Sequence, residues 1–485
     1  MRHQAKAAQA WRVDLAFWCL LVLFALLITL TRRGAETWTS ADFGLYVMHA
    51  RNLVDGVPYA ATAYIPNPHN SIISPAAYPF GYPLLLSLPF ASRGLSMPAL
   101  ELVGCLSLIA IVAALWVMAR RRLDGGWGLV AALGAGCVPQ LLDLRDTISS
   151  DLAFTAWVML ALCLHARAEK APALLALFLA VFMAEATRSA GIALAAALIA
   201  TDLLARRRGW QVRMAMTAGG TAAAILVNQL LGADAAGTYM SYLDRVREAP
   251  GAFLLHAVED YLVGLSHALG LSFGKAGNLA ALGLFGLLAL LGWGRTLSRG
   301  LSADLLFLPA SAALLLAFPV RLETARYLVP LLPLLVLYAV DGAALLARGW
   351  RFGPPVAAAA LLIGFGGRYL ERNPFAPLPM PAFTAAVANE LVRMGAQIPN
   401  RAVVLAPNPR VVALYTRDRT SIWPEHPRAE DIWNPARRMG AQYLLLQYPP
   451  LDAAQARVEA ILKARPGGVE PVAQTHHFRL YRFVR

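Results

Sequence analysis

The chain has 485 residues, of which 58% are hydrophobic and only 15% charged, and its mean hydropathy is +0.53. This composition excludes an ordinary soluble protein of this length and predicts an integral membrane protein. The formal net charge of +14 would suggest nucleic-acid binding in a soluble protein. Many of the basic residues, however, lie in short loops between apolar runs, so we attribute them to membrane topology and expect no nucleic-acid partner.

Eleven apolar runs are long enough to cross a membrane as helices. They cover residues 13–31, 97–119, 126–142, 149–166, 171–187, 189–205, 212–232, 278–294, 303–320, 327–347 and 353–370. No small-residue cleavage site follows the first run, so we expect a retained helix. The four cysteines all fall inside these runs without metal-ligand spacing, which favours packing residues over disulfides or a zinc site: Cys19, Cys105, Cys137 and Cys163.

Basic residues concentrate in alternate connections between the runs, as the positive-inside rule requires if the N-terminus is cytoplasmic. Arg120 to Arg122 and Arg206 to Arg208 are the densest groups, and Arg32-Arg33 is the clearest exception. An odd number of spans then places everything after residue 370 outside. We therefore predict a protein of the plasma (bacterial inner) membrane with a cytoplasmic N-terminus and an extracytoplasmic C-terminal domain.

A proline-rich linker from Asn373 to Pro381 separates the membrane part, residues 1–372, from a domain at 380–485. The pattern in this domain predicts a small α/β fold. Its expected order is helix 383–394, strand 402–406, helix 409–415, strand 420–423, helix 429–439, strand 442–447, helix 452–464 and a strand pair around 471–484.

Two outer connections, residues 32–96 and 233–277, are too long for simple turns, and long outer loops often carry function. The second includes an amphipathic stretch at 252–271. In the first, residues 41–54 have helical spacing along the membrane surface and Gly56 is placed to end that helix. A short apolar run after Tyr78-Pro79-Phe80-Gly81-Tyr82-Pro83 predicts an interfacial or re-entrant piece.

Asp42 stands at the start of that first surface helix, where a carboxylate can reach both lipid and water. Thr39-Ser40-Ala41-Asp42 also resembles a capping box, in which Thr39 caps the helix and the acidic residue reaches back to the backbone. Residue type alone does not decide between these roles.

The next outer connection holds a dense polar cluster, Asp143-Leu144-Arg145-Asp146-Thr147-Ile148-Ser149-Ser150-Asp151. Asp151 is also placed to cap the helix that follows. Because charge near hydrocarbon is costly unless it is paired or used, Asp146 and Asp151 are candidate supporting acids of a site.

Three arginines, Arg188, Arg321 and Arg326, lie at outer span mouths, where the positive-inside rule disfavours them. Simple ion pairs with Glu185 and Glu323 would explain them. The alternative is a phosphate, since the guanidinium fork binds phosphate oxygens in pairs. Four outer histidines show no metal-binding spacing, so no cofactor is required and a divalent metal remains an open possibility: His49, His69, His256 and His267.

In this order the motifs over residues 13–370 resemble bacterial relatives of the protein O-mannosyltransferases and the lipid A aminoarabinose transferase, which have the membrane-embedded C-type glycosyltransferase superfold. The resemblance rests on Ser40-Ala41-Asp42 with Tyr46 and Ala50-Arg51-Asn52-Leu53, on the Tyr78 to Leu85 segment, on Ser150-Asp151, on Thr187-Arg188-Ser189-Ala190-Gly191-Ile192 and on Arg326-Tyr327-Leu328-Val329-Pro330. It departs from the family at Phe43, where a second acid is common, and at Phe80, where a second proline is usual.

The resemblance implies sugar transfer from a polyprenyl-phosphate donor to a lipid, glycan or protein acceptor, with membrane lipids around the enzyme. Asp42 matches the family's catalytic base, and the arginines Arg188, Arg321 and Arg326 would bind the donor phosphate. One base suffices for inversion, unlike the two carboxylates of retaining hydrolases.

A polytopic transporter or lipid-linked sugar flippase is the alternative reading, and a non-catalytic scaffold is a third. A transporter should show charged or broken-helix sites near mid-membrane and an internal repeat, and the sequence offers little of either. A scaffold would leave the outer acidic residues and arginines without a function.

Overall fold

The computed structural model describes residues 2–32, 42–67, 77–233, 250–317, 324–366, 385–423, 427–428, 432–433, 440–450 and 453–484. The chain divides into two compact units. Unit 1 consists of Met1–Arg33, Glu101–Val227 and Tyr239–Ala376, and unit 2 of Gly34–Leu100, Asn228–Thr238 and Pro377–Arg485. The predicted boundary between 1–372 and 380–485 stays a prediction.

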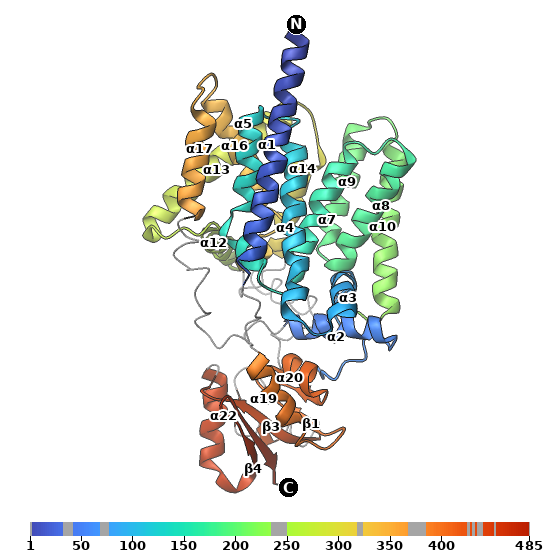
Figure 1. The fold of residues 1–485 in the computed structure, drawn as a ribbon, viewed down its shortest axis with the longest axis vertical. Coiled ribbons are helices and arrows are strands. Elements are labelled where there is room, and N and C mark those ends of the chain that lie inside the picture. Colours follow the sequence, from blue (N-terminus) through green and yellow to red (C-terminus); the bar gives the residue numbers. More distant parts are fainter. Residues whose placement is uncertain are drawn as a thin grey trace. The chain divides into compact units, whose positions relative to one another are not determined.

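Unit 1 is a helical bundle (Figure 1). Its helices are α1 (Arg2–Leu30), α4 (Met97–Ala119), α5 (Gly125–Gly136), α6 (Pro139–Leu144), α7 (Ser150–His165), α8 (Ala171–Thr187), α9 (Gly191–Ala205), α10 (Trp210–Leu230), α12 (Pro250–Ala268), α13 (Gly274–Ser298), α14 (Ala303–Ala317), α15 (Thr324–Tyr327), α16 (Leu332–Leu346), α17 (Gly353–Leu361) and the π-helical η1 (Leu362–Gly366). The first turn of α4 and the last turn of α10 belong to unit 2.

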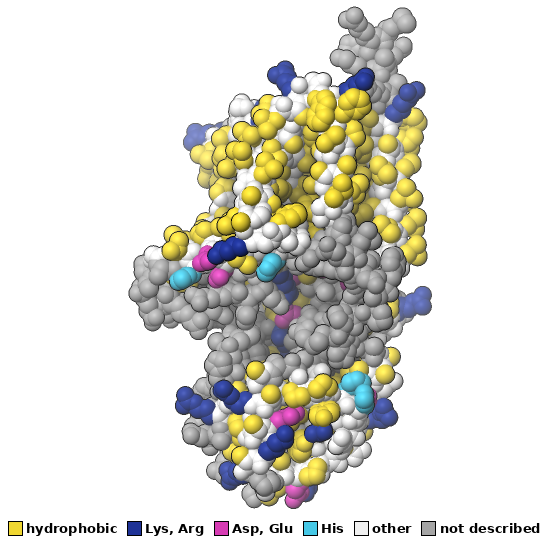
Figure 2. Space-filling view, turned by 90° about the vertical axis from the view of Figure 1, so that its left-hand side faces the viewer, with side chains coloured by type: hydrophobic (Ala, Val, Ile, Leu, Met, Phe, Trp, Pro, Cys, Tyr) yellow, Lys and Arg dark blue, Asp and Glu magenta, His cyan; other side chains and the backbone are white. Residues whose placement is uncertain are grey.

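The helices of unit 1 are apolar on the outside as well as in the core. On α1, for example, Leu23, Leu26 and Leu27 are all more than half exposed. Figure 2 shows hydrophobic side chains covering these helices, with Lys and Arg side chains gathered at one end. A helix that is apolar all round lies in a core or a membrane, which supports the membrane reading.

The count of eleven spans is not confirmed. Among the described residues, three helices are long and apolar enough to cross a membrane, at Trp11–Leu30, Met97–Ala119 and Gly274–Ser298, while six further apolar helices are shorter. One physical reason is proline, which lacks an N–H and disfavours a helical residue before it. The run 126–142 breaks into α5 and α6 at Pro139 for this reason.

Unit 2 joins the connection between α1 and α4, which the sequence analysis expects to be the first outer loop, to the C-terminal segment. The loop supplies α2 (Asp42–Asp55) and α3 (Gly81–Arg93). The prediction that a helix spans 41–54 and ends at Gly56 agrees with α2, and Gly56 has a φ of 66°, as a helix-ending glycine should. The short apolar run after Tyr78 forms α3, whereas its expected place at the membrane surface stays a prediction.

The C-terminal segment forms a small α/β fold with a five-stranded mixed sheet. Its elements are α19 (Ala385–Gly395), β1 (Val403–Leu405), α20 (Pro409–Thr416), β2 (Arg419–Ser421), β3 (Ala441–Gln447), α22 (Ala453–Ala464), the 3₁₀ turn η2 (Pro466–Gly468), β4 (Val469–Gln474) and β5 (Phe478–Phe483). The expected strands are found near their predicted positions, and the expected helix at 429–439 lies almost wholly outside the described residues.

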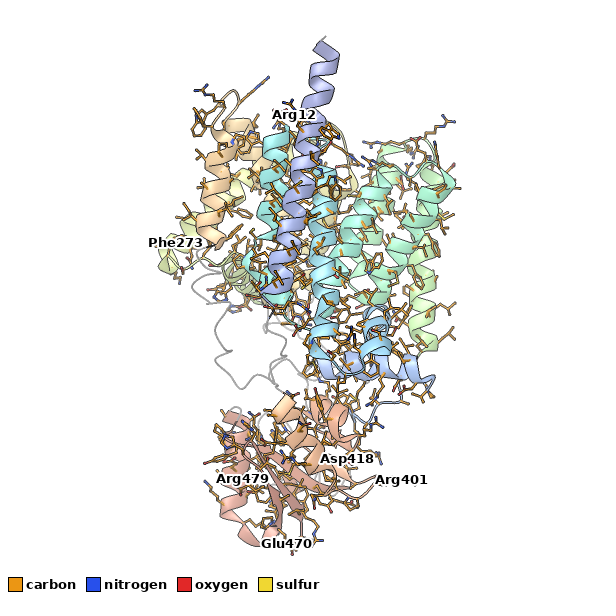
Figure 3. All side chains as sticks on the ribbon, in the orientation of Figure 1. Arg12, Phe273, Arg401, Asp418, Glu470 and Arg479 are labelled. Carbon is orange, nitrogen blue, oxygen red and sulfur yellow. The ribbon has the colours of Figure 1, made fainter. Side chains whose placement is uncertain are left out.

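The strand order is β2-β1-β3-β5-β4, with β1 parallel to β2 and β3, and β5 antiparallel to β3 and β4. Asp418, beside β2, and Glu470, on β4, therefore mark opposite edges (Figure 3). Apolar side chains of β3 share a core with Val458 and Leu462 of α22. At the β2 edge of the sheet, the Thr420 hydroxyl of β2 donates to the Pro409 carbonyl at the start of α20 at 2.6 Å.

The connection between α1 and α4 pairs with the edge of this sheet. Tyr64 bridges Thr420 in parallel, and the Ile65 N–H donates to the Thr420 carbonyl at 2.7 Å. The Ser421 hydroxyl and the Asn67 amide add side-chain bonds between the same two segments. Backbone pairing of this kind fixes register, so residues of the loop and of the C-terminal segment are held together within unit 2.

Candidate functional site

The first candidate site, which we call the Asp42 cluster, lies in unit 2 and comprises Asp42, Tyr78 and Arg410. Asp42 begins α2, Tyr78 precedes α3, and Arg410 lies in the first turn of α20. Arg410 Nη1 donates to Asp42 Oδ1 at 2.8 Å, and the Tyr78 hydroxyl donates to the same oxygen at 2.8 Å. Arg410 Nη1 also lies 3.0 Å from the Tyr78 hydroxyl oxygen, which closes a triangle.

Burial differs among the members of the Asp42 cluster. The Arg410 side chain is 9% exposed, whereas that of Asp42 is 22% exposed. Burial acts to lower the pKa of Arg410, but Tyr78 and Asp42 outweigh it and raise that pKa above its usual value. Arg410 is therefore a fixed positive charge beside a carboxylate that solvent can reach.

A glycine allows this contact. A Cβ on Gly44 would lie 2.8 Å from the Arg410 carbonyl oxygen, so only glycine lets α2 approach the backbone of α20 so closely. Gly44 lies two residues after Asp42, on the same helix. The packing of α2 on α20 thus brings Asp42 to Arg410.

Aromatic and histidine side chains pack against Tyr78 and bond its backbone. Its ring stacks on Tyr46 at 4.5 Å between centroids. His49 is fully buried, its Nδ1 lies 2.9 Å from the Tyr59 carbonyl, and its Nε2 accepts from the Tyr78 N–H at 3.3 Å. The Tyr59 hydroxyl in turn donates to the Tyr78 carbonyl at 2.7 Å. These bonds require neutral His49 with the proton on Nδ1, and burial correspondingly lowers its pKa to about 4.

The second candidate site, the Asp151 cluster, lies in unit 1 and comprises Asp151, Arg188 and Arg326. Asp151 is 2% exposed in the first turn of α7. Arg188, at the end of α8, bonds one carboxylate oxygen, and Arg326 Nε donates to the other at 2.5 Å. The Arg188 guanidinium also lies over the Tyr327 ring, 5.6 Å from its centroid.

Local turns place the two arginines. Gly191 follows Arg188, and a Cβ there would lie 2.7 Å from the Cα of Glu185, so glycine permits the tight turn between α8 and α9. A Cβ on Gly264 of α12 would lie 2.5 Å from Thr324 Oγ1, which shows how closely α12 supports the short α15 that carries Arg326. Close packing on both sides therefore directs both guanidiniums to Asp151.

The pairing differs from the simple ion pairs weighed from the sequence. Arg188 pairs with Asp151 and not with its neighbour Glu185, while Glu323 and Arg321 lie outside the described residues. The N-cap residue of α7 is Ser149, which makes no side-chain capping bond, while Asp151 binds both arginines. Thr39, the proposed capping partner of Asp42, also lies outside the described residues.

Asp146 is brought to different partners. Arg145 Nε donates to Asp146 Oδ1 at 3.2 Å, and the fully buried Arg145 also donates to the Thr31 carbonyl at the end of α1. A Cβ on Gly104 would lie 3.1 Å from the Arg145 carbonyl oxygen. This pair therefore ties α1 to the connection before α7.

In the part of the chain that the structure describes, no group of three or more His, Cys, Asp or Glu side chains is arranged to hold a metal ion. The four cysteines are free. The expectation that no cofactor is required, with a divalent metal possible, stays a prediction.

Arg410 was not among the residues expected from the sequence. It lies 368 positions from Asp42, in a segment for which the sequence predicts a small α/β fold and an outer location but no site residue. Tyr78 was noted only as part of its motif. No local sequence pattern around Tyr78 or Arg410 predicts that these residues bond a carboxylate.

The sequence matches no protein-family model and no curated protein. Solved structures do match. ArnT from Cupriavidus metallidurans bound to undecaprenyl phosphate aligns over 98% of this chain and 98% of its own, with a TM-score of 0.57 at 13% identity. Its apo form gives a TM-score of 0.55 at 15% identity over 99% and 98%.

An oligosaccharyltransferase from Archaeoglobus fulgidus aligns over 89% of this chain and 69% of its own, with a TM-score of 0.57 at 13% identity. At identities this low, the structural similarity shows a common fold and nothing more. This chain therefore has the fold of ArnT and of the archaeal oligosaccharyltransferase, which agrees with the fold expected from the sequence.

Proposed function

We propose that this protein is a membrane glycosyltransferase that moves a sugar from a polyprenyl-phosphate donor to an acceptor hydroxyl on the extracytoplasmic side. The fold supports the reaction class, and the likeness to an ArnT structure that holds undecaprenyl phosphate supports the donor class. The observation that carries the proposal is the convergence of Arg188 and Arg326 on Asp151. Two guanidiniums held together by one buried carboxylate form a preorganised anion site.

In this proposal the Asp151 cluster receives the donor phosphate. Arginine keeps its charge near lipid and offers planar, paired donors to phosphate oxygens. As the bond between the anomeric carbon and the phosphate oxygen breaks, its electron pair passes to that oxygen. The arginines stabilise the negative charge that develops there, while Asp151 keeps them aligned.

Asp42 serves as the general base. The acceptor oxygen attacks the anomeric carbon from the face opposite the leaving phosphate, and its proton passes to the Asp42 carboxylate. One displacement inverts the configuration and needs no covalent glycosyl intermediate. Arg410 and Tyr78 act as positioning residues, because both bond Asp42 Oδ1 and fix the carboxylate in one orientation.

The test is a transfer assay with purified protein, radiolabelled polyprenyl-phosphate sugars and candidate acceptors. We expect Asp42→Asn to lower the rate at least about hundredfold, the usual contribution of a general base. Asp55→Asn, the same exchange at the exposed last position of α2, is the matched control and should leave the rate near wild type.

Full transfer by Asp42→Asn at an unchanged melting temperature would exclude Asp42 as base. Movement of the lipid-linked sugar across vesicles without any transfer product would instead favour a flippase. Both readouts use the same reconstituted protein.

A further inference from the structure

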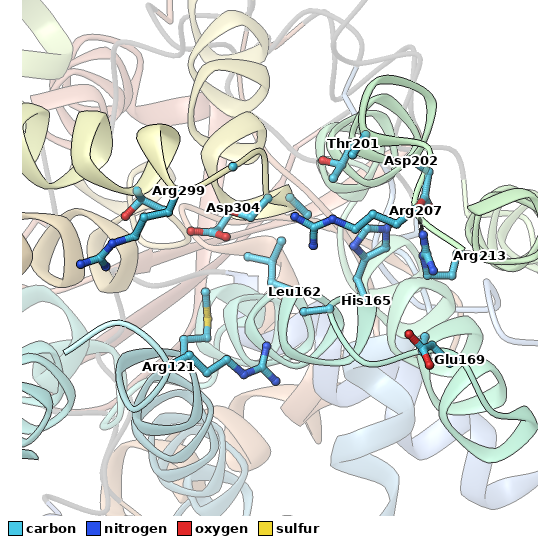
Figure 4. A pocket seen from close by; sticks show the side chains of 18 of the residues that line it. Arg121, Leu162, His165, Glu169, Thr201, Asp202, Arg207, Arg213, Arg299 and Asp304 are labelled. Carbon is cyan, nitrogen blue, oxygen red and sulfur yellow. Dashed lines mark hydrogen bonds and ion pairs between the residues drawn. The ribbon is translucent and has the colours of Figure 1, made fainter. Parts of the chain in front are cut away.

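Unit 1 also contains a basic cavity that the proposed reaction does not use. It has a volume of about 360 Å³ and lies where the connections after α4, α7, α9 and α13 meet. Asp151 and His165 stand at opposite ends of α7, so this cavity is at the other end of the helix from the Asp151 cluster, roughly 20 Å away at 1.5 Å per residue. Figure 4 shows its lining.

The lining is strongly basic. Six arginines face only three carboxylates: Arg121, Arg122, Arg207, Arg208, Arg213 and Arg299 against Glu169, Asp202 and Asp304. Arg121 and Arg207 point into the cavity from two different connections (Figure 4). The positive charge is therefore concentrated around one open cavity.

Two of the three carboxylates are already committed to buried contacts. Asp202 accepts from Arg213 Nη2 at 2.6 Å and lies 2.9 Å from His165 Nε2. Asp304 binds Arg122 through both oxygens, at 2.7 and 2.8 Å, and also accepts the Tyr338 hydroxyl. Asp202 and Asp304 therefore neutralise Arg213 and Arg122, and not the other arginines of the lining.

The other four arginines of the lining lack such a carboxylate partner among the described residues: Arg121, Arg207, Arg208 and Arg299. Within the described ranges, no carboxylate lies within ion-pair distance of any of them. Arg207 donates to the Leu301 carbonyl at 2.8 Å and Arg299 to the Arg122 carbonyl at 3.3 Å, and both bonds orient the side chains without forming an ion pair. Burial, and then the positive charge of Arg167, lowers the pKa of Arg121, as expected where cations crowd together.

The positive-inside rule accounts for arginines at this end of the bundle but not for their convergence on a cavity. The four arginines without a described carboxylate partner are exposed to solvent, as topological charges also are. Their side chains nevertheless lie around one open cavity, whose inner wall contains the buried Asp202 and Asp304 groups and the hydroxyl-bearing residues Thr201 and Ser302. Several arginine forks and hydroxyls around one cavity match the oxygens of a phosphate group.

We propose that the basic cavity is a binding site for a phosphate-bearing anion, separate from the donor site at the other end of α7. The phosphate comes either from the headgroup of an anionic lipid or from a free phosphate in solution. The chemistry of recognition is the same in both cases.

The experiment measures binding of inorganic phosphate to the purified full chain in neutral detergent by calorimetry, at constant ionic strength made up with chloride. A second arm measures binding of short-chain phosphatidic acid, with phosphatidylcholine as the zwitterionic comparison. Saturable binding in the first arm identifies a free phosphate, and binding in the second arm alone identifies a lipid headgroup. Either result supports the site.

Arg121→Gln and Arg207→Gln should each weaken this binding about tenfold, the effect of one lost charge-assisted hydrogen bond. Arg206→Gln is the matched control, because Arg206 adjoins Arg207 but does not line the cavity. Arg188→Ala should retain the binding, which separates this site from the proposed donor site.

The proposal is overturned if neither phosphate nor phosphatidic acid binds saturably. It is also overturned if Arg206→Gln weakens binding as much as Arg207→Gln, because the effect would then be one of general charge. Since Arg121 and Arg207 hold no carboxylate among the described residues, their replacement should leave the melting temperature without ligand unchanged, and that measurement accompanies each titration.

Discussion

Asp151 is a buried carboxylate that binds two arginines from distant segments, so each arginine has both a structural and a proposed functional role. If Arg188 and Arg326 bind the donor phosphate, Arg188→Ala and Arg326→Ala should weaken donor binding at least about tenfold. The remaining arginine still pairs with Asp151 in each variant, so we expect only a modest loss of stability. Donor binding and melting temperature are measured on the same samples.

Arg120 offers a matched control for these two variants. Like Arg188, it pairs with one aspartate, Asp14 at 2.9 Å, and lies over an aromatic ring, that of Trp116. Arg120→Ala therefore removes the same kinds of contact without touching the Asp151 cluster. A loss of donor binding that merely follows the melting temperature across all three variants would contradict the phosphate role.

His49 makes the Asp42 cluster sensitive to acid. Burial holds its pKa near 4, while the unfolded chain binds the proton near pH 6.5. A lowered pKa gives stability that is present above pH 6.5 and is lost as the pH falls toward 4. The loss should reach about 3 kcal/mol.

Thermal unfolding between pH 8 and pH 4 measures this loss. His49→Gln should be less stable than wild type at pH 7 but lose less on acidification, so the two curves converge. His256→Gln, at an exposed position on α12, is the control for the effect on stability of a His-to-Gln exchange at a site without buried contacts. An identical acid slope in wild type and His49→Gln would refute the assignment.

At the level of single residues, the sequence predicted Asp42, Asp151, Arg188 and Arg326 as polar groups at helix ends, and the structure brings the last three together. It could not predict Arg410 as the partner of Asp42. Contacts between distant segments depend on the pairing of Tyr64 with Thr420 and on the closeness that Gly44 allows. A single sequence holds no record of such contacts.

At the level of elements, the crossing of α13 and α16 is the closest helix contact in the described part of unit 1 by the glycine geometry. A Cβ on Gly292 would lie 2.0 Å from the Tyr338 carbonyl oxygen, and one on Gly342 would lie 2.0 Å from the Leu288 carbonyl oxygen. Small residues at reciprocal positions let two membrane helices meet backbone to backbone. The crossing also places Tyr338, which bonds Asp304 in the wall of the basic cavity.

Gly292→Ala and Gly342→Ala should therefore each destabilise the protein by about 1–3 kcal/mol, the usual cost of overpacking. Gly283→Ala is the control on the same helix, because a Cβ there meets nothing within 4 Å and alanine favours helix. Melting temperatures in detergent give the comparison. Equal melting temperatures for Gly292→Ala and Gly283→Ala would contradict the close contact between α13 and α16.

The element scale also shows where periodicity succeeds and where it fails. The runs 97–119 and 171–187 coincide with α4 and α8 because no proline interrupts them after the first turn. The run 327–347 does not form one helix, since α15 ends at Tyr327 and α16 begins at Leu332, around Pro330 and Pro333. Hydropathy reports the length of an apolar run, whereas backbone hydrogen bonding decides the length of the helix.

At the level of the whole molecule, the charge pattern predicts which end of unit 1 faces the cytoplasm. The arginine-rich connections around the basic cavity lie at one end, and the Asp151 cluster lies at the other end of α7. The positive-inside rule assigns the basic end to the cytoplasm. The odd number of crossings expected from the sequence assigns the C-terminal segment to the opposite side.

Single cysteines test this orientation directly. The four natural cysteines are free and are first replaced by alanine, since a membrane-impermeant maleimide must report only the new thiol. Arg401→Cys, at an exposed position before β1 (Figure 3), should be labelled in intact cells, and Arg348→Cys, exposed after α16, only after the membrane is permeabilised. Labelling of Arg348→Cys alone in intact cells would invert the topology and place the basic cavity, not the Asp151 cluster, on the outside.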